Sequence, residues 1–215
     1  MAFRARMSIL ACVLSFNALA GTYLPAISFE ENQGNRWSII ASLGYGQYQQ
    51  VYSDDGKTAL GRLAVSAELL STSQTAIGLE VGVQNGNHMR LALPFGTLGT
   101  LGGVVRTTVK PMLDFLVTAN TAPINESLLY TQFKGGIAYR QWQMDTVLIS
   151  NKTELAGEVQ AGFGYPLTEI TSLNLLYQGV FGGTPRFRQG WLTDNAHISN
   201  IPVQHGVLLG FSVIA

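Results

Sequence analysis

Two side chains near the C-terminal end of the chain could act as a base and a nucleophile. His197 and Ser199 are separated by one residue, so in an extended segment they face the same side. A serine hydroxyl becomes nucleophilic when a neighbouring imidazole takes its proton, and a carboxylate holds that imidazole in the working tautomer. No Asp or Glu follows Asp194. The pair is therefore a candidate catalytic site whose orienting acid would have to be Asp194, Glu154 or Glu158, brought close by the fold.

Metal and nucleotide sites lack the spacing that they need. His88, His197 and His205 are too far apart to form a short ligand motif. The glycine-rich stretch 95–103 is not followed by Lys-Ser or Lys-Thr in the register of a phosphate-binding loop. We therefore expect no metal and no cofactor.

A second group of candidate residues shares a position in a pattern. Nine charged side chains fall at even-numbered positions of segments whose odd positions are apolar: Arg62, Glu68, Glu80, Arg106, Lys110, Asp114, Lys134, Arg140 and Glu158. They could line an ion pathway, or they could pair and fill the interior. Buried charges are costly unless they are paired, and five basic against four acidic residues is close to balance. The sequence favours an interior charge network.

The elements that carry these charges read as β-strands. Apolar and polar residues alternate with a period of two, as on a strand with one apolar face. The clearest case is a hairpin in which 58–70 and 76–86 flank a polar turn. The eight segments are 36–47, 58–70, 76–86, 104–118, 128–140, 154–165, 172–181 and 203–214. They predict an all-β fold, an eight-stranded antiparallel up-and-down barrel that spans a membrane.

The connections and the apolar face both suit a transmembrane barrel. Long connections (49–57, 87–103, 141–153 and 182–202) alternate with short ones (70–75, 119–127 and 166–171), as long extracellular loops alternate with short periplasmic turns. A soluble lipocalin-like barrel would instead turn its apolar face inward. Aromatic residues on the odd face near strand ends fit lipid-facing interfacial girdles: Trp37, Tyr45, Tyr139, Tyr165, Phe181 and Phe211.

Two local features depart from the regular pattern of strands and polar loops. Pro111 removes a backbone donor from the fourth segment, which predicts a bulge or break there. The connection 87–103 is unusually apolar for a solvated loop, so we expect it to fold over the barrel mouth or against the outer leaflet.

Composition and the N-terminus indicate export. Only 12% of the residues are charged, and the mean hydropathy is +0.19, between a soluble protein and a helical membrane protein. Residues 1–20 have the basic start, apolar core and Ala-Leu-Ala end of a cleaved signal peptide. We expect a periplasmic lead-in at 21–35 and the barrel at 36–215. Cleavage removes the only cysteine and leaves 11 basic against 13 acidic residues, which gives no basic patch for nucleic acid.

The chain resembles the small eight-stranded outer-membrane barrels of the OmpA/OmpX/OmpW-like group. The stretches KPMLDFLVT, KGGIAYR, GEVQAGFGYPL and NIPVQHGVLLGFSVIA are similar to segments of uncharacterised gammaproteobacterial outer-membrane proteins. The resemblance implies contact with outer-membrane lipid and lipopolysaccharide, handling by the barrel-assembly machinery, and a possible extracellular partner at the long loops. Such barrels usually end in an aromatic residue, whereas this chain ends in Val213-Ile214-Ala215, where Phe211 is the nearest substitute.

A narrower resemblance concerns the first candidate site. The stretch His197-Ile198-Ser199-Asn200 resembles the H-x-S-N motif of the outer-membrane lipid A 3-O-deacylases, in which the matching His is the base and the matching Ser the nucleophile. That family has a glutamate shortly downstream, and this chain has none. We expect a non-enzymatic outer-membrane protein with a structural or surface-interaction role and a plugged lumen. The alternatives are a deacylase-like enzyme that uses His197 and Ser199, and a small channel.

Overall fold

The computed structural model describes residues 36–49, 51–72, 74–91, 103–104, 106–124, 127–144, 152–182 and 203–215. The predicted signal peptide, the lead-in 21–35, most of the connection 87–103, and the candidate residues His197 and Ser199 lie outside these residues. None of the helices in the described part of the chain is long and apolar enough to cross a membrane.

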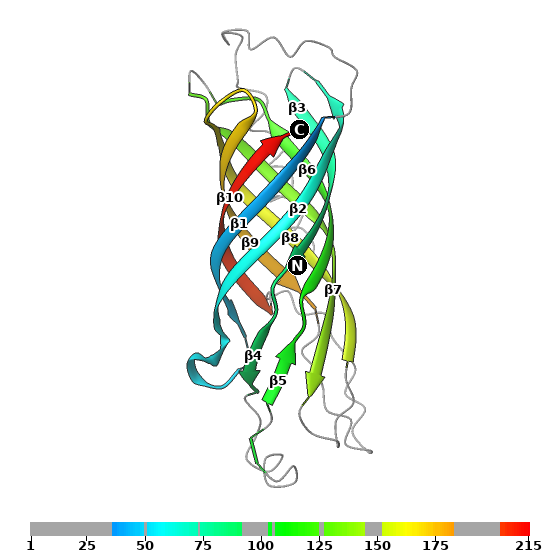
Figure 1. Cartoon of the computed structure of the whole chain (residues 1–215), viewed down its shortest axis with the longest axis vertical. Coiled ribbons are helices and arrows are strands. Elements are labelled where there is room, and N and C mark those ends of the chain that lie inside the picture. The colour runs from blue at the N-terminus through cyan, green and yellow to red at the C-terminus, as the bar shows by residue number, and fades with distance from the viewer. Residues whose placement is uncertain are drawn as a thin grey trace, which may run out of the picture.

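Eight antiparallel strands close into a barrel (Figure 1). They are β1 (Trp37–Tyr48), β2 (Lys57–Ser71), β3 (Thr75–Gln84), β6 (Met112–Thr121), β7 (Tyr130–Met144), β8 (Lys152–Pro166), β9 (Thr171–Phe181) and β10 (Gln204–Ile214). Each strand pairs with the next in this series, and the β1–β10 ladder joins the last strand to the first. The predicted fold class is confirmed. Because the barrel is closed, each of the eight strands has a hydrogen-bonded neighbour on both sides, as backbone groups in a lipid environment require.

At one end, two additional short strands extend the barrel. A further hairpin, β4 (Asn87–Arg90) and β5 (Arg106–Val109), lies at the end that carries the long connections, the lower end in Figure 1. Here β5 also pairs with β7, and a short 3-10 helix, η2 (Ser53–Gly56), packs nearby. The segment from residue 87 was predicted as part of a connection, and its first four residues are instead a strand. We call this end the long-loop end and the opposite one the short-turn end.

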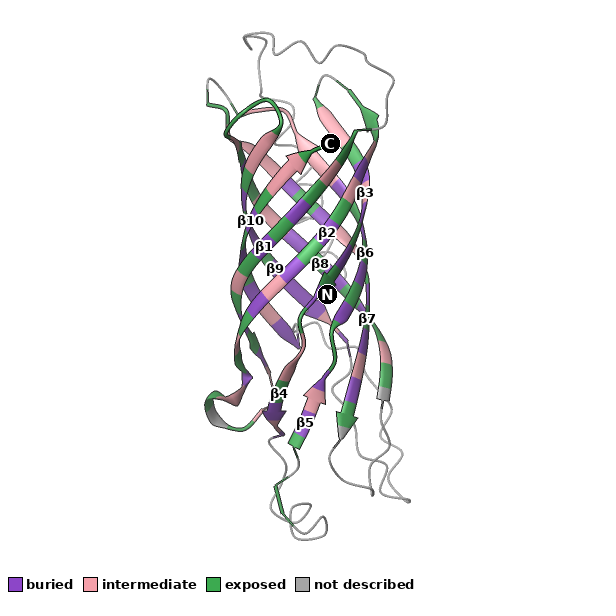
Figure 2. Ribbon diagram, in the orientation of Figure 1, coloured by how far each residue is buried: buried purple, intermediate pink, exposed green. Residues whose placement is uncertain are grey.

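Burial alternates along the barrel strands with the predicted phase (Figure 2). Even-numbered side chains point into the lumen and odd-numbered apolar side chains point outward, as Leu43, Val81 and Leu175 do. Five of the six predicted girdle residues are exposed. Trp37, Tyr165 and Phe211 lie towards the short-turn end, Tyr45 and Tyr139 towards the long-loop end, and Phe181 is half-buried. This polarity is the reverse of a lipocalin-like barrel.

The phase reverses where β3 leads into β4, between the buried residues Gln84 and Met89, and again on the neighbouring segment at Lys110-Pro111. Thr107 and Val109 are buried on one side of this break, and Met112 is buried on the other. Pro111 has no N–H, so the ladder stops at Lys110, whose N–H bonds to the carbonyl of Gln141. The backbone then restarts with the opposite residues facing inward.

The reversal corrects two predicted positions. Arg106 and Lys110 were expected in the interior network, but both are exposed and point outward from β5 and its end. Because one residue of slip turns every side chain to the other face, a single break is enough to move both cations out of the lumen.

Apolar side chains fill much of the remaining lumen in three clusters. One contains Leu60, Leu176 and Leu208, a second contains Met112, Ala138, Ala156 and Val180, and a third at the long-loop end contains Tyr48, Met89, Leu91, Val109 and Trp142. An eight-stranded barrel encloses a space that side chains can fill completely. These clusters and the charges between them occupy that space.

Candidate functional site in the barrel lumen

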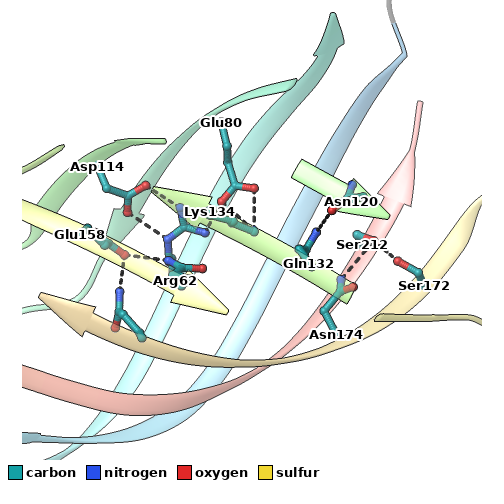
Figure 3. A network of polar contacts seen from close by, with 12 residues as sticks. Arg62, Glu80, Asp114, Asn120, Gln132, Lys134, Glu158, Ser172, Asn174 and Ser212 are labelled. Carbon is teal, nitrogen blue, oxygen red and sulfur yellow. Dashed lines mark hydrogen bonds and ion pairs between the residues drawn. The ribbon is translucent and has the colours of Figure 1, made fainter. Parts of the chain in front are cut away.

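Four charged side chains interlock in the middle of the lumen (Figure 3). Arg62 makes a bidentate pair with Asp114, with Nε–Oδ2 at 2.9 Å and Nη2–Oδ1 at 2.5 Å. Its Nη1 lies 2.7 Å from Glu80 Oε1. Lys134 Nζ reaches both oxygens of Glu80, at 3.0 and 2.7 Å. All four residues are at least 97% buried, so each charge is neutralised by a partner rather than by water.

A glycine makes the arrangement possible. Arg62 is on β2 and Asp114 on β6, and β3 lies between these strands, with Gly82 directly opposite Asp114 in the register. A Cβ at Gly82 would lie 2.5 Å from Arg62 Nη2 and 2.7 Å from Asp114 Oδ1. The absent side chain therefore leaves the space in which guanidinium and carboxylate meet.

Glutamines take the place of a cation beside Glu158. Gln160 Nε2 and Gln178 Nε2 both donate to Glu158 Oε1, at 2.7 and 2.6 Å. Gln178 also reaches Gln84 Oε1 at 2.9 Å, which links β9 to β3 across the lumen. Glu158 is held by hydrogen bonds, and no ion pair with it occurs in the described part of the chain.

The short-turn end of the lumen is polar and partly open. A cavity of about 210 Å³ lies there, with Glu80 and Glu68 among its lining residues. Its wall carries hydrogen-bonded polar groups: Gln132 donates to Asn120 at 2.9 Å, and Tyr130 Oη lies 3.0 Å from Asn174 Oδ1. Glu68 is half-buried at this cavity rather than in the central network.

Arg140 has different surroundings. It is fully buried, yet its Nε, Nη1 and Nη2 make no hydrogen bond, and it takes part in no ion pair within the described residues. Its guanidinium lies over the ring of Trp142, with Cζ 5.4 Å from the ring centroid. A cation–π contact compensates only part of the lost hydration. Among the described charged side chains of the lumen, Arg140 therefore has a guanidinium that lacks a hydrogen-bond acceptor at all three nitrogens.

An ion pair fastens the long-loop end outside the barrel proper. Arg90 on β4 makes a bidentate pair with Asp55 of η2, at 2.6 and 2.8 Å, and its guanidinium lies 4.8 Å from the Tyr52 ring centroid. The hydrogen bond from the Arg90 side chain is the main cause that lowers the pKa of Asp55 to about 2. The isolated bridge between Val51 and Leu91 supports the same contact.

The structure thus separates the nine predicted charges. It brings Arg62, Glu80, Asp114 and Lys134 together, places Glu158 beside them and Arg140 apart. The glutamines Gln84, Gln160 and Gln178 were not predicted as network members. They share the even parity of the charges, and that parity was the signal that could have found them.

The first candidate site cannot be built from the described residues, because His197 and Ser199 lie outside them. Of the carboxylates considered as its orienting acid, Glu158 is inside the lumen and already bonded by two glutamines. No group of three or more potential metal ligands occurs among the residues that the structure describes.

No protein-family model and no curated protein sequence matches the chain. Solved structures do. The outer membrane protein OprG from Pseudomonas aeruginosa matches with a TM-score of 0.51 and 12% identity, over 84% of this chain and 96% of that one. AlkL matches with a TM-score of 0.42 and 17% identity over 91% and 96%, and the outer membrane enzyme PagL with 0.39 and 13% over 82% and 98%. At these identities the likeness concerns the fold alone, and the chain shares with OprG the architecture of a small closed antiparallel β-barrel.

Proposed function

We propose that this chain is an integral outer-membrane protein with a closed lumen and a structural or surface-interaction role. The barrel exposes a continuous band of apolar side chains, including Leu43, Leu63 and Leu155, each at least 64% exposed. Such a band on a soluble protein would be an aggregation-prone surface. On a barrel whose charged side chains lie inside the lumen, it is the lipid-facing surface.

The observation that carries the closed lumen is the fully paired charge network. Arg62, Glu80, Asp114 and Lys134 span β2, β3, β6 and β7, and apolar clusters lie elsewhere in the lumen. An ion crossing this level would have to break buried pairs, each of which costs several kcal/mol to leave uncompensated. The arrangement supports a plug rather than a channel.

Conductance of the refolded protein in a planar lipid bilayer tests this proposal. We expect the wild-type protein to insert without long-lived open-channel currents. An Arg62→Ala/Lys134→Ala variant, which removes both central cations, should conduct more than the wild type. Large, stable currents from the wild type would instead support the small-channel alternative.

The phase reversal at Pro111 supports a specific contact with the outer leaflet. Arg106 and Lys110 point outward just beyond the exposed apolar residues Leu113 and Tyr139. The long-loop end is extracellular if this barrel follows the usual orientation, and there these cations lie at the level of lipopolysaccharide phosphates. A surface contact through charge is screened by salt.

This contact can be tested with matched charge changes. We expect Arg106→Gln/Lys110→Gln to lower the amount of lipopolysaccharide that remains bound to the purified barrel. Lys57→Gln is the control, because Lys57 is already paired with Asp54 at 2.6 Å. Equal retention by the double variant and the wild type would contradict the assignment.

We also propose that the protein is not a lipid A deacylase. The sequence gives His197 no downstream acid, and the loss of the orienting carboxylate alone costs about 10⁴ in kcat in the serine-protease template. The test is to express the wild type and Ser199→Ala in a host with intact lipid A and to compare the acyl chains by mass spectrometry. Loss of one acyl chain in the wild type alone would identify an enzyme.

A further inference from the structure

Among the described residues at the long-loop end of the lumen, buried hydrogen-bond donors without a partner outnumber buried acceptors without one. Arg140, Trp142 and Gln204 contribute five buried nitrogens without a partner: Nε, Nη1 and Nη2 of Arg140, Nε1 of Trp142 and Nε2 of Gln204. On the same three residues only one buried acceptor, Gln204 Oε1, lacks a partner. Native proteins pair nearly all buried polar groups, so a cluster of this kind needs an explanation.

These side chains are contiguous. The Arg140 guanidinium lies over the Trp142 ring, and the Trp142 and Tyr48 rings form a T-shaped pair with their centroids 6.2 Å apart. Tyr48 is directly opposite Gln204 in the β1–β10 register. The cluster therefore joins β7, β1 and β10 at one end of the lumen.

The carboxylates that act on Arg140 in the described part of the chain do not pair with it. Glu154 lies directly opposite it in the β7–β8 register, and Glu154 and Glu158 act on the guanidinium electrostatically. Neither carboxylate forms an ion pair with it. Small residues adjoin the guanidinium instead, since a Cβ at Gly182 would lie 3.0 Å from Nη2 and 3.1 Å from the Cβ of Ala156.

We propose that Arg140 anchors a binding site for a small carboxylate at the long-loop end of the lumen. A carboxylate matches the planar guanidinium fork with two parallel hydrogen bonds. Two protein carboxylates act on the single positive charge of Arg140, so a doubly charged phosphate would meet more repulsion here than a singly charged carboxylate. Guanidinium is also more weakly hydrated than ammonium, which suits a site walled by Trp142 and Tyr48. This site is separate from the central plug, so it does not depend on whether the lumen conducts.

The test uses NMR of the full refolded protein in micelles, with acetate as the probe. The Nε–H of Arg140 and the indole N–H of Trp142 report on the site directly. We expect saturable shifts of both signals with sodium acetate, at constant ionic strength set by sodium chloride. Acetamide, which has the same shape without the charge, should cause no saturable shift. Phosphate at pH 8 should bind more weakly than acetate.

Variants separate the site from general effects of anions. Arg140→Met should abolish the acetate-dependent shift at Trp142, whereas Lys57→Met, which removes an exposed cation, should leave it unchanged. If Arg140→Met does not fold, Arg140→Lys serves, because it keeps the charge and loses the fork, and it should weaken acetate binding about tenfold. A shift that acetamide reproduces, that persists in Arg140→Met, or that is unaltered in Arg140→Lys would overturn the proposal. Tighter binding of phosphate than of acetate, or no saturable shift with acetate, would do the same.

Discussion

Arg62 and Arg140 are both buried arginines of the same barrel, and their surroundings are opposite. The Arg62 guanidinium contacts two carboxylates through three short contacts of 2.9 Å or less. The Arg140 guanidinium has an aromatic face beneath it and no hydrogen-bond acceptor. Both lie on even positions of alternating strands, so the local pattern around them is the same.

The difference shows that an inward position does not by itself determine whether a charged side chain forms an ion pair. Around Arg62, Gly82 leaves room for Asp114 to approach from a second strand, and the result is a rigid cross-link between β2, β3 and β6. Around Arg140, Glu154 lies directly opposite in the register, yet none of the three guanidinium nitrogens has a hydrogen-bond partner, and Ala138, Trp142 and Ala156 beside it offer no charged acceptor. The first arrangement is structural, and the second is suited to an external anion.

The largest expected effect on stability comes from removing the Arg62 guanidinium. Arg62→Met leaves Asp114 buried without its cation, and removing one partner of a buried pair typically costs about 3–5 kcal/mol. We expect a loss of this size in the free energy of unfolding, measured by urea titration of the protein refolded into lipid vesicles.

A double variant provides the control for that loss. In Arg62→Met/Asp114→Leu the orphaned carboxylate is gone, and apolar replacements of a buried pair are often neutral. Most of the lost stability should return. A double variant as unstable as Arg62→Met alone would show that packing around Arg62, rather than its charge, is decisive.

The next effect is smaller and concerns the space in which the pair forms. Gly82→Ala would place a methyl group between Arg62 and Asp114, and overpacking of a filled interior costs about 1–3 kcal/mol. Gly61→Ala is the matched control on β2, because its Cβ would only touch Leu43 Cδ2 at 4.0 Å. We expect Gly82→Ala alone to lower the urea midpoint, and equal midpoints in the two variants would refute this role of Gly82.

The sequence predicts the inward face well and the contacts within it poorly. Alternation alone identified Arg62, Glu80, Asp114 and Lys134 as inward, because a strand period of two leaves no other choice. It could not show that Arg62 reaches over Gly82 to Asp114, since that contact depends on the register of three strands. The fixed phase failed where Pro111 interrupts the ladder, which turns Arg106 and Lys110 outward.

The same limit explains why Arg140 was grouped with the paired charges. A count of five basic and four acidic residues suggested complete pairing, but two of those cations are outside the lumen and Glu158 is held by glutamines. Pairing is a property of distances between strands, and charge balance along the sequence does not supply them.

A third prediction tests whether the buried charge of Arg140 destabilises the fold. Because its guanidinium is buried without acceptors, Arg140→Met removes a desolvated charge and keeps a side chain of similar length. We expect the free energy of unfolding to rise by about 1 kcal/mol, the lower end of the cost of an unsatisfied buried group. The sign is opposite to that for Arg62→Met under the same urea titration. A loss comparable to that of Arg62→Met would place Arg140 among the structural charges.

The smallest expected effect extends the comparison to a third arginine, Arg90, which is paired like Arg62 but in contact with solvent. Its hydrogen bond to Asp55 lowers the pKa of that carboxyl from 3.8 to about 2. A lowered pKa means that the pair stabilises the long-loop end fully above pH 4, and that this contribution is lost as the pH falls through about 2. We expect the carboxyl carbon of Asp55 to titrate near pH 2 by NMR, and near its ordinary value in Arg90→Gln. Lys57→Gln, which removes a nearby cation that is paired with Asp54, should leave the Asp55 midpoint in place. An Asp55 midpoint near 4 in the wild type would mean that the hydrogen bond between Arg90 and Asp55 does not persist in solution. Stable ion pairing would then be limited to the buried charges of the lumen.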